Sequence, residues 1–402
     1  MQLNLKNQRF YSLDVFRGAT VCLMILVNNP GSWSNIYPPL EHAQWHGVTP
    51  TDLVFPFFLF AVGNALAFVM PKFETHPSKI FWKKIIKRTL VIFGIGLFLN
   101  WMPFVKWQND EIVFKPWIYL TDNGDQAGIR IFGVLQRIAV AYFFASALIY
   151  LLKIRRAFIA SIVILLGYWF LCVVLNPGDP FSLTGWFGTN VDAYILGEPH
   201  MYHGENLNGI PVAFDPEGIM SSFGSIAQVM FGYFCGDYII KKGRTSEMLN
   251  GLFAAGLVLM FTGYMWDMVF PMNKKIWSSS YTVFTSGMAM SIIALMIYKI
   301  ELNNKKNWLT KFFDVFGKNP LFIFFLSGFL PRALALIRIP NGLSDTGATL
   351  YTTPFNWFYE NVCKPVFPDN LNNSSLLYAL VMIVFYWIIV FIMDKKKIYI
   401  KV

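Results

Sequence analysis

The feature that most constrains this chain is a series of apolar runs, each about as long as a helix that crosses a lipid bilayer. A crossing helix needs about 20 predominantly apolar residues. We predict ten such helices, at residues 13–29, 51–70, 84–103, 130–152, 156–175, 219–240, 248–270, 280–299, 315–337 and 376–393. The aromatic stretch 355–359 is a candidate for an eleventh. We therefore expect an all-α, polytopic integral membrane protein with a single transmembrane domain over residues 1–402.

Composition supports a membrane setting and argues against a nucleic-acid partner. Only 14% of the residues are charged and 55% are hydrophobic, whereas a soluble domain carries about 25% charged residues. The net charge is +10, but the lysines and arginines lie in small clusters between the apolar runs. That distribution is typical of membrane topology rather than of a phosphate-binding face. The expected surroundings are a lipid bilayer.

The basic residues are unequally shared between the two sides of the predicted membrane. With a cytoplasmic N-terminus, the inner segments and their boundary residues carry 20 of the 33 Lys and Arg, and the outer segments carry six. Those outer segments are residues 30–50, 104–129, 176–218, 271–279 and 338–375. This asymmetry follows the positive-inside rule and predicts that both termini are cytoplasmic. No small-residue cleavage site follows the first apolar run, so we expect no cleaved signal peptide.

The long outer loop 176–218 is acidic and contains no lysine or arginine. Such a loop attracts a cationic substrate better than an anionic one. The alternative is a solvated loop that merely obeys the topology rule. Its Glu198, His200, His203 and Glu205 do not match the ligand spacing of a zinc site, so we expect no metal.

The loop 30–50 joins the first two predicted helices and carries His42 and His46. It ends in Thr49-Pro50-Thr51-Asp52, a pattern typical of a helix start because it supplies a cap, a first-turn proline and an acid at the positive helix end. Asp52 is either only a cap or also a partner of His42. Imidazole exchanges protons near neutral pH, so His42 is a candidate catalytic group; the alternative is a structural, hydrogen-bonded histidine.

Asn28 ends the first predicted helix, where Asn28-Asn29-Pro30-Gly31 stops it. Its amide is therefore expected near the same outer mouth as His42. The aromatic side chains of Trp33, Tyr37 and Trp45 would form walls around this region.

Ionisable residues inside predicted spans are candidates for function. Asp14 and Arg17 lie three residues apart and can pair on one helix face; Arg17 is either an anion-binding group or half of an interfacial ion pair. Arg137 follows Gln136 about two turns inside the fourth span. We expect it to face a polar interior, an acid or a ligand phosphate.

Two further motifs lie at helix ends. Gly317-Lys318-Asn319-Pro320 combines a helix break with a lysine, which would bind an anion or extend to the lipid headgroups. Trp277-Ser278-Ser279-Ser280-Tyr281 places a cluster of hydroxyls at an outer helix start, and an N-cap explains only one of them.

Together these motifs resemble one family, the transmembrane N-acetyltransferases typified by heparan-α-glucosaminide N-acetyltransferase, and in particular its bacterial members. The matching segments run in the family's order from residue 12 to about residue 320. They are SLDVFRG (12–18), residues 26–28, HAQWHGVTPTDLVFPF (42–57), GVLQR (133–137), LGEPHMY (196–202), FDPEG (214–218) and WSSSY (277–281).

The resemblance implies transfer of an acetyl group from cytoplasmic acetyl-CoA to an amine, such as the amino sugar glucosamine, on the extracytoplasmic side. It implies that Asn28 and His42 form the catalytic pair, with His42 as general base and Asn28 as oxyanion or positioning donor. No role transfers to His46, because the lysosomal enzyme has Asn there. The expected location is a bacterial inner membrane, with a homodimer as a candidate assembly.

We accordingly predict two groups of supporting residues. The residues expected to bind the cofactor are Arg17, Gln136, Arg137, Ser279, Ser280, Lys318 and Asn319. Those expected on the acceptor side or in support are Asp14, Trp45, Asp52, Asp215, Glu217 and Trp277. Direct transfer and transfer through an acetyl-histidine both stay open. The alternative functions are an O-acetyltransferase of a cell-surface polysaccharide and a small-solute transporter, the latter expected to contain inverted repeats.

Overall fold

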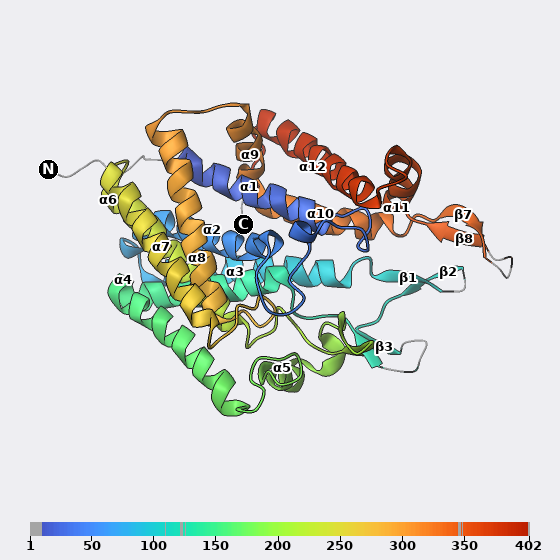
Figure 1. Cartoon of the computed structure of the whole chain (residues 1–402), viewed down its shortest axis with the longest axis horizontal. Helices are drawn as coiled ribbons and strands as arrows, with labels where there is room; N and C mark the ends of the chain where they lie inside the picture. The colour runs from blue at the N-terminus through green and yellow to red at the C-terminus, as the bar shows by residue number, and fades with distance from the viewer. Residues whose placement is uncertain are drawn as a thin grey trace.

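The computed structural model describes residues 10–108, 110–120, 124, 126–344, 347 and 349–400. Long helices dominate this part of the chain (Figure 1). They are α1 (Tyr11–Asn28), α2 (Val54–Glu74), α3 (Ser78–Trp101), α4 (Val134–Leu175), α6 (Ser222–Lys242), α7 (Ser246–Asp267), α8 (Ser279–Ile297), α9 (Trp308–Lys318), α10 (Pro320–Leu334) and α12 (Leu371–Lys395). The shorter α5 (Gly188–Leu196) and α11 (Pro354–Phe358) lie between them, as do several single turns.

Every predicted span coincides with a helix, and three of them differ in form. The predicted spans 130–152 and 156–175 are both part of α4, whose backbone leaves helical geometry at Lys153 (φ 60°, ψ 170°). The predicted span 315–337 is the pair α9 and α10, which meet at 75°. The break falls at Asn319-Pro320, because proline cannot continue the hydrogen-bond ladder of α9.

Within the described residues, six helical segments are long and apolar enough to cross a membrane, or seven if the bent pair counts as one span. The six are residues 11–28, 50–74, 134–175, 246–267, 279–302 and 371–395. Neither α3 nor α6 is among them, and α3 carries a run of lysines in its first half. The count of ten and the cytoplasmic termini therefore stay predictions.

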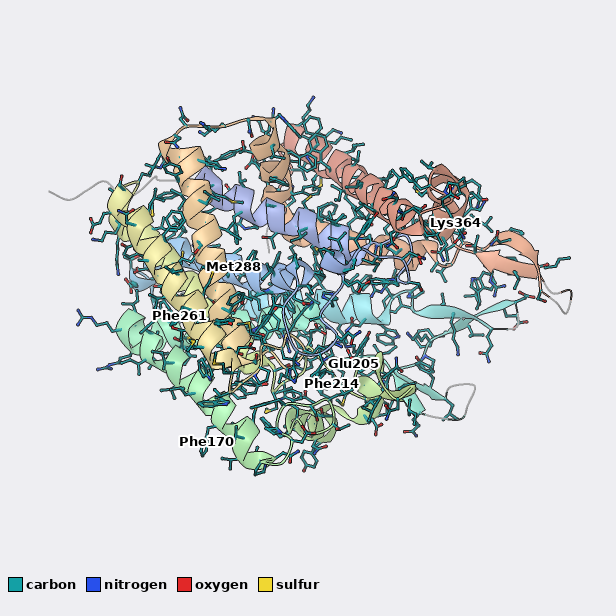
Figure 2. All side chains as sticks on the ribbon, viewed as in Figure 1. Phe170, Glu205, Phe214, Phe261, Met288 and Lys364 are labelled. Carbon is teal, nitrogen blue, oxygen red and sulfur yellow. The ribbon has the colours of Figure 1, made fainter. Side chains whose placement is uncertain are left out.

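The outward faces of the long helices are apolar. Phe170 of α4 and Phe261 of α7, both labelled in Figure 2, are each 63% exposed. Leu166 and Leu257 on the same helices are exposed as well. An exposed apolar surface of this extent is typical of a protein that contacts lipid.

The described residues also form four small hairpins, which the all-α prediction did not include. β1 (Val105–Gln108) pairs with β2 (Glu111–Phe114), β3 (Ile118–Leu120) with β4 (Gln126–Gly128), β5 (Glu205–Leu207) with β6 (Ile210–Val212), and β7 (Ile339–Leu343) with β8 (Thr349–Thr352). All four pairs are antiparallel. They occupy the predicted outer loops 104–129, 176–218 and 338–375. In Figure 1 the labelled pairs extend beyond the ends of the helices. The all-α description thus holds for the helix bundle and not for these loops.

Helices α2 and α6 cross closely because each has a glycine at the contact. A Cβ built on Gly63 would lie 1.8 Å from the carbonyl oxygen of Val229, and one on Gly232 would lie 2.1 Å from that of Phe60. Small residues allow helix backbones to approach in this way. This contact holds α2, whose N-terminus follows the turn Pro50–Leu53, against α6 in the bundle.

Candidate active site

The site begins where the loop 30–50 enters α2. Pro50–Leu53 form a single turn directly before the helix. Asp52 Oδ2 accepts hydrogen bonds from the backbone N–H of Thr49 and from that of Ala43, both at 3.1 Å. The Asp52 side chain is only 1% exposed. The predicted helix start is therefore confirmed, with Thr49 as the N-cap residue and Asp52 as the third residue of a capping box.

The other carboxylate oxygen of Asp52 holds the histidine. Asp52 Oδ1 lies 2.7 Å from His42 Nδ1. An Nδ1–H that donates to this carboxylate leaves Nε2 as the proton acceptor of the ring. The Tyr281 hydroxyl of α8 donates to the backbone carbonyl of Asp52 at 2.5 Å, which ties the turn to the bundle. Asp52 therefore supports the helix start and is also the partner of His42, which is the second of the two interpretations left open by the sequence.

His42 and Asn28 line one cavity of about 170 Å³. Its polar lining is Asn28, His42, Thr51, Glu217 and Lys274, and the rest of its wall is apolar. The apolar residues are Met24, Val27, Val54, Phe55, Phe58, Val134, Ile138 and Phe324, which come from α1, α2, α4 and α10. The structure therefore brings together the two residues predicted as the catalytic pair.

Lys274 is a cavity residue that the sequence analysis did not single out. It lies in the connection between α7 and α8, and its Nζ is 3.1 Å from His42 Nδ1 and 3.5 Å from Asp52 Oδ1. Burial lowers the pKa of Lys274, and the charges of Asp52 and Glu217 act in the opposite direction. The only signal in the sequence was its place three residues before the motif at Trp277, as one of the two lysines of the outer segment 271–279.

Glu217 belongs to an ion network beside the cavity. Arg130 Nη2 lies 2.6 Å from Asp215 Oδ1 and 2.5 Å from Glu217 Oε2, and Arg130 Nε donates to Asp215 Oδ2 at 3.0 Å. Burial raises the pKa of Glu217, but Arg130 and Arg137 outweigh that effect and lower it. Glu217 thus presents a carboxylate to the cavity, while Asp215 lies behind it and holds Arg130.

Arg137 lies behind the cavity wall rather than in it. The side chain is fully buried, and its guanidinium carbon lies 4.9 Å from the ring centre of Trp277 and 6.0 Å from that of Phe55. One of its nitrogens donates to the Ser221 hydroxyl. Its contacts are thus one hydroxyl and the cation–π faces of Trp277 and Phe55. The expectation that Arg137 faces an acid or a ligand phosphate stays a prediction.

Several residues predicted to bind the cofactor have partners within the protein. Gln136 Nε2 donates to the Ile131 carbonyl at 2.9 Å. Ser279 Oγ donates to the Leu165 carbonyl at 2.8 Å, and Ser280 Oγ donates to that of Phe270. Gln136, Ser279 and Ser280 are buried and do not line the cavity.

A second polar cluster lies at the bend between α9 and α10. Arg17 Nη1 lies 3.3 Å from Asp14 Oδ1 and 3.2 Å from the Gly317 carbonyl, so the predicted pair forms. Lys318 Nζ lies 2.8 Å from Asp314 and 3.0 Å from Asp394. None of these charged groups lines the cavity.

Two other predicted residues have structural contacts. Asn319 Nδ2 donates to the Ile398 carbonyl, and its Oδ1 accepts from the Ile400 N–H, so Asn319 holds the C-terminal segment. Trp45 Nε1 donates to the Phe181 carbonyl at 2.8 Å, and its ring packs edge-on against Phe214, which is labelled in Figure 2.

The fold and the site define a class of protein: a bundle of apolar helices that encloses a carboxylate-bound histidine beside an amide and a lysine. The family model of heparan-alpha-glucosaminide N-acetyltransferase, catalytic, matches residues 9–190 of this chain. That range includes Asn28, His42 and Asp52, whereas Glu217 and Lys274 lie beyond it.

Two curated relatives carry the same name. The human heparan-alpha-glucosaminide N-acetyltransferase (Homo sapiens) is 28% identical over 368 residues, covering 79% of this chain and 52% of the relative. The mouse protein (Mus musculus) is 25% identical over 365 residues, covering 79% and 53%. The chain thus spans about half the length of the curated relatives it matches. The resemblance inferred from the motifs is confirmed by these matches.

Proposed function

We propose that this chain is a transmembrane N-acetyltransferase that moves an acetyl group from acetyl-CoA to an amine, with an amino sugar such as glucosamine as acceptor. The observation that carries the proposal is the shared cavity: Asn28 from α1 and His42 from the following loop face one space of about 170 Å³. The similarity to two proteins named as N-acetyltransferases supports the reaction type.

His42 acts as the general base in this proposal. An amine attacks a thioester only through its free electron pair, so a proton must leave the nitrogen as the new C–N bond forms. His42 Nε2 accepts that proton, and Asp52 stabilises the imidazolium through its 2.7 Å contact with Nδ1. The proton then passes to the departing sulfur as the C–S bond breaks.

Asn28 acts as the donor to the thioester oxygen. As the amine adds, negative charge collects on that oxygen, and an amide N–H aimed at it stabilises the transition state. Such a donor typically contributes about 3–4 kcal/mol. The exposed Asn28 side chain at the end of α1 is free to turn toward a carbonyl placed in the cavity.

The apolar wall suits the uncharged part of the donor. Eight of the thirteen lining residues are apolar, which matches the thioester methyl group and the pantetheine arm better than it matches a phosphate. We assign the nucleotide to the cluster at the α9–α10 bend, where Arg17 donates to the Gly317 carbonyl and Lys318 pairs with Asp314. Arg137, Gln136, Ser279 and Ser280 would then support the wall from behind. The donor side is cytoplasmic and the acceptor side is opposite, in a bacterial inner membrane.

The test uses the purified chain with acetyl-CoA and two acceptors, glucosamine and its hydroxyl analogue glucose. We expect N-acetylglucosamine and free CoA to form, and glucose to react far more slowly. His42→Ala should abolish transfer and retain binding of acetyl-CoA. Normal turnover by His42→Ala would refute the assignment, and a preference for glucose would favour the O-acetyltransferase.

Direct transfer and an acetyl-histidine intermediate are separated by one further measurement. In a single turnover with acetyl-CoA and no acceptor, an intermediate on His42 adds the mass of one acetyl group to the protein. Direct transfer leaves the mass of the protein unchanged whether or not the acceptor is present.

A further inference from the structure

His42 lies within a set of charged groups of both signs. Asp52 and Lys274 contact it directly, and Glu217 faces it across the same cavity. Behind these lie the charged groups of Arg130, Asp215 and Arg137. These groups are three acids, Asp52, Asp215 and Glu217, and three bases, Arg130, Arg137 and Lys274. Two further charged residues act on this set, Asp192 on Arg137 and Lys275 on Lys274.

Lys274 acts on the ring through its charge rather than through one directed hydrogen bond. Its Nζ lies 3.1 Å from Nδ1 and 3.4 Å from Nε2 of His42. The two ring nitrogens point in diverging directions, so an ammonium this close to both is aligned with neither. The Lys274 side chain is only 22% exposed, so solvent screens its charge weakly.

We infer that Lys274 is a positioning residue whose positive charge opposes the effect of Asp52 on the protonation of the His42 ring. The inference rests on the proposed function for the use of His42 as a proton acceptor. Lys274 is far from Asn28 and His42 in sequence, and it acts on the protonation of the proposed base.

The physical reason is a conflict in the role of Asp52. A carboxylate 2.7 Å from imidazole orients the ring, but it also favours the charged imidazolium. An imidazolium has no electron pair to accept a proton from an amine. The positive charge of Lys274, at a similar distance, opposes this stabilisation of the imidazolium. It leaves the orientation of the His42 ring unchanged. The negative charge of Glu217, like that of Asp52, favours the imidazolium, but it acts from across the cavity.

The test measures the protonation of His42 directly. Diethyl pyrocarbonate modifies neutral imidazole and not imidazolium, and mass spectrometry of the peptide fragments separates His42 from His46. The rate of modification of the full-length protein is measured between pH 4.5 and 9. Its half-maximal pH reports the titration of His42 without any acetyl transfer.

Four variants define the expected result. In Lys274→Met the half-maximal pH should rise by about one unit, because a charge within 4–6 Å shifts a titration by that order. In Glu217→Gln it should fall. Lys274→Arg keeps the charge and should stay near wild type. Lys275→Met is the matched control: Lys275 pairs with Glu205, labelled in Figure 2, at 2.7 Å and does not line the cavity.

The outcomes distinguish this inference from the proposed function. An unchanged half-maximal pH in folded Lys274→Met, or a rise equal to that of Lys275→Met, overturns the inference whatever the enzyme activity is. Should Lys274→Met fail to fold, the neutral Lys274→Gln replaces it. A half-maximal pH that does not fall in Glu217→Gln overturns the inference as well. The expected shifts without any acetyl transfer would support the inference and refute the function. With activity present, the acid limb of kcat/KM should move in parallel with the labelling.

Discussion

At the scale of single residues, two neighbouring asparagines at the end of α1 have different surroundings. Asn28 lines the cavity, whereas Asn29 Nδ2 donates back to the Ile25 carbonyl at 2.9 Å. We expect Asn28→Ala to lower kcat by about 10²–10³, since it removes a donor to the developing oxyanion. Asn29→Ala should cost about 1 kcal/mol of stability and leave kcat nearly unchanged. Steady-state kinetics and thermal unfolding separate the two, and equal losses of kcat would contradict the assignment of Asn28.

Asp52 combines two roles that a pair of variants can separate. Asp52→Asn removes the charge that stabilises the imidazolium of His42, so kcat should fall by about 100-fold or more. Thr49→Val removes the contact between the Thr49 hydroxyl and Asp52 at 3.1 Å and leaves the carboxylate in place. It should lower the melting temperature and change kcat by less than about threefold. A Thr49→Val variant as inactive as Asp52→Asn would show that the cap alone matters.

Sequence patterns predicted the roles of Asn28 and His42 but not that of Lys274. Asn28 and His42 lie close together in the chain, at the end of one apolar run and before the next, so a local pattern indicates both. Lys274 reaches the site across 232 positions. A lysine in an outer loop matches no motif, and only the packing of α8 against α2 places it beside the ring.

At the scale of helices, the close crossing of α2 and α6 depends on Gly63. Gly63→Ala places a methyl group where the Val229 carbonyl oxygen lies at 1.8 Å, so the helices must separate. We expect a loss of about 1–3 kcal/mol of stability, as for overpacking in a core. Gly94→Ala in α3 is the control, because no atom lies within 4 Å of its added Cβ. Thermal unfolding of the purified variants measures both, and equal melting temperatures would contradict the packing argument.

The helices could be predicted because the length of an apolar run is a strong signal, whereas the hairpins could not be predicted. Strands of three to five residues in loops lack the repeated alternation that identifies a strand. The bend between α9 and α10 was indicated by Asn319-Pro320, but its angle depends on the surrounding contacts. Among these is the hydrogen bond from Asn319 Nδ2 to the Ile398 carbonyl, which no local pattern reveals.

The junction of α5 with the segment before α6 predicts a pH dependence of stability. Asp192 is fully buried, and its Oδ1 accepts from the Ile219 N–H at 3.0 Å. Burial raises the pKa of Asp192 to about 7, despite the opposing effect of the N–H donors of Met220 and Ile219. The protonated carboxyl is therefore favoured by the fold. Its stabilising contribution is complete below pH 3.8, the usual pKa, and is lost as the pH rises through about 7.

Asp192→Asn removes this titration. Melting temperatures of variant and wild type should be most similar at the acid end, near pH 4, and the wild type should be less stable near pH 8 by about 1–4 kcal/mol. Asp369→Asn, at an exposed position, is the control and should follow the wild type at every pH. A constant difference between Asp192→Asn and wild type from pH 4 to pH 8 would contradict the buried, protonated carboxyl.

At the scale of the whole molecule, the proposal requires the cavity to receive a donor from one side of the membrane and an acceptor from the other. The cavity lies among α1, α2, α4 and α10, with the loop carrying His42 at one end. Charge asymmetry predicts that this loop is extracytoplasmic. The polar cluster at the α9–α10 bend, with Arg17 and Lys318, is the proposed donor entrance.

Transfer across a sealed vesicle tests this claim most directly. Acetyl-CoA labelled in its acetyl group is trapped inside vesicles that contain the protein, and glucosamine is supplied only outside. We expect labelled N-acetylglucosamine to appear outside while intact labelled acetyl-CoA stays within, and no product to form with His42→Ala. Product that forms only when both substrates are on the same side, or equally with His42→Ala, would contradict the account.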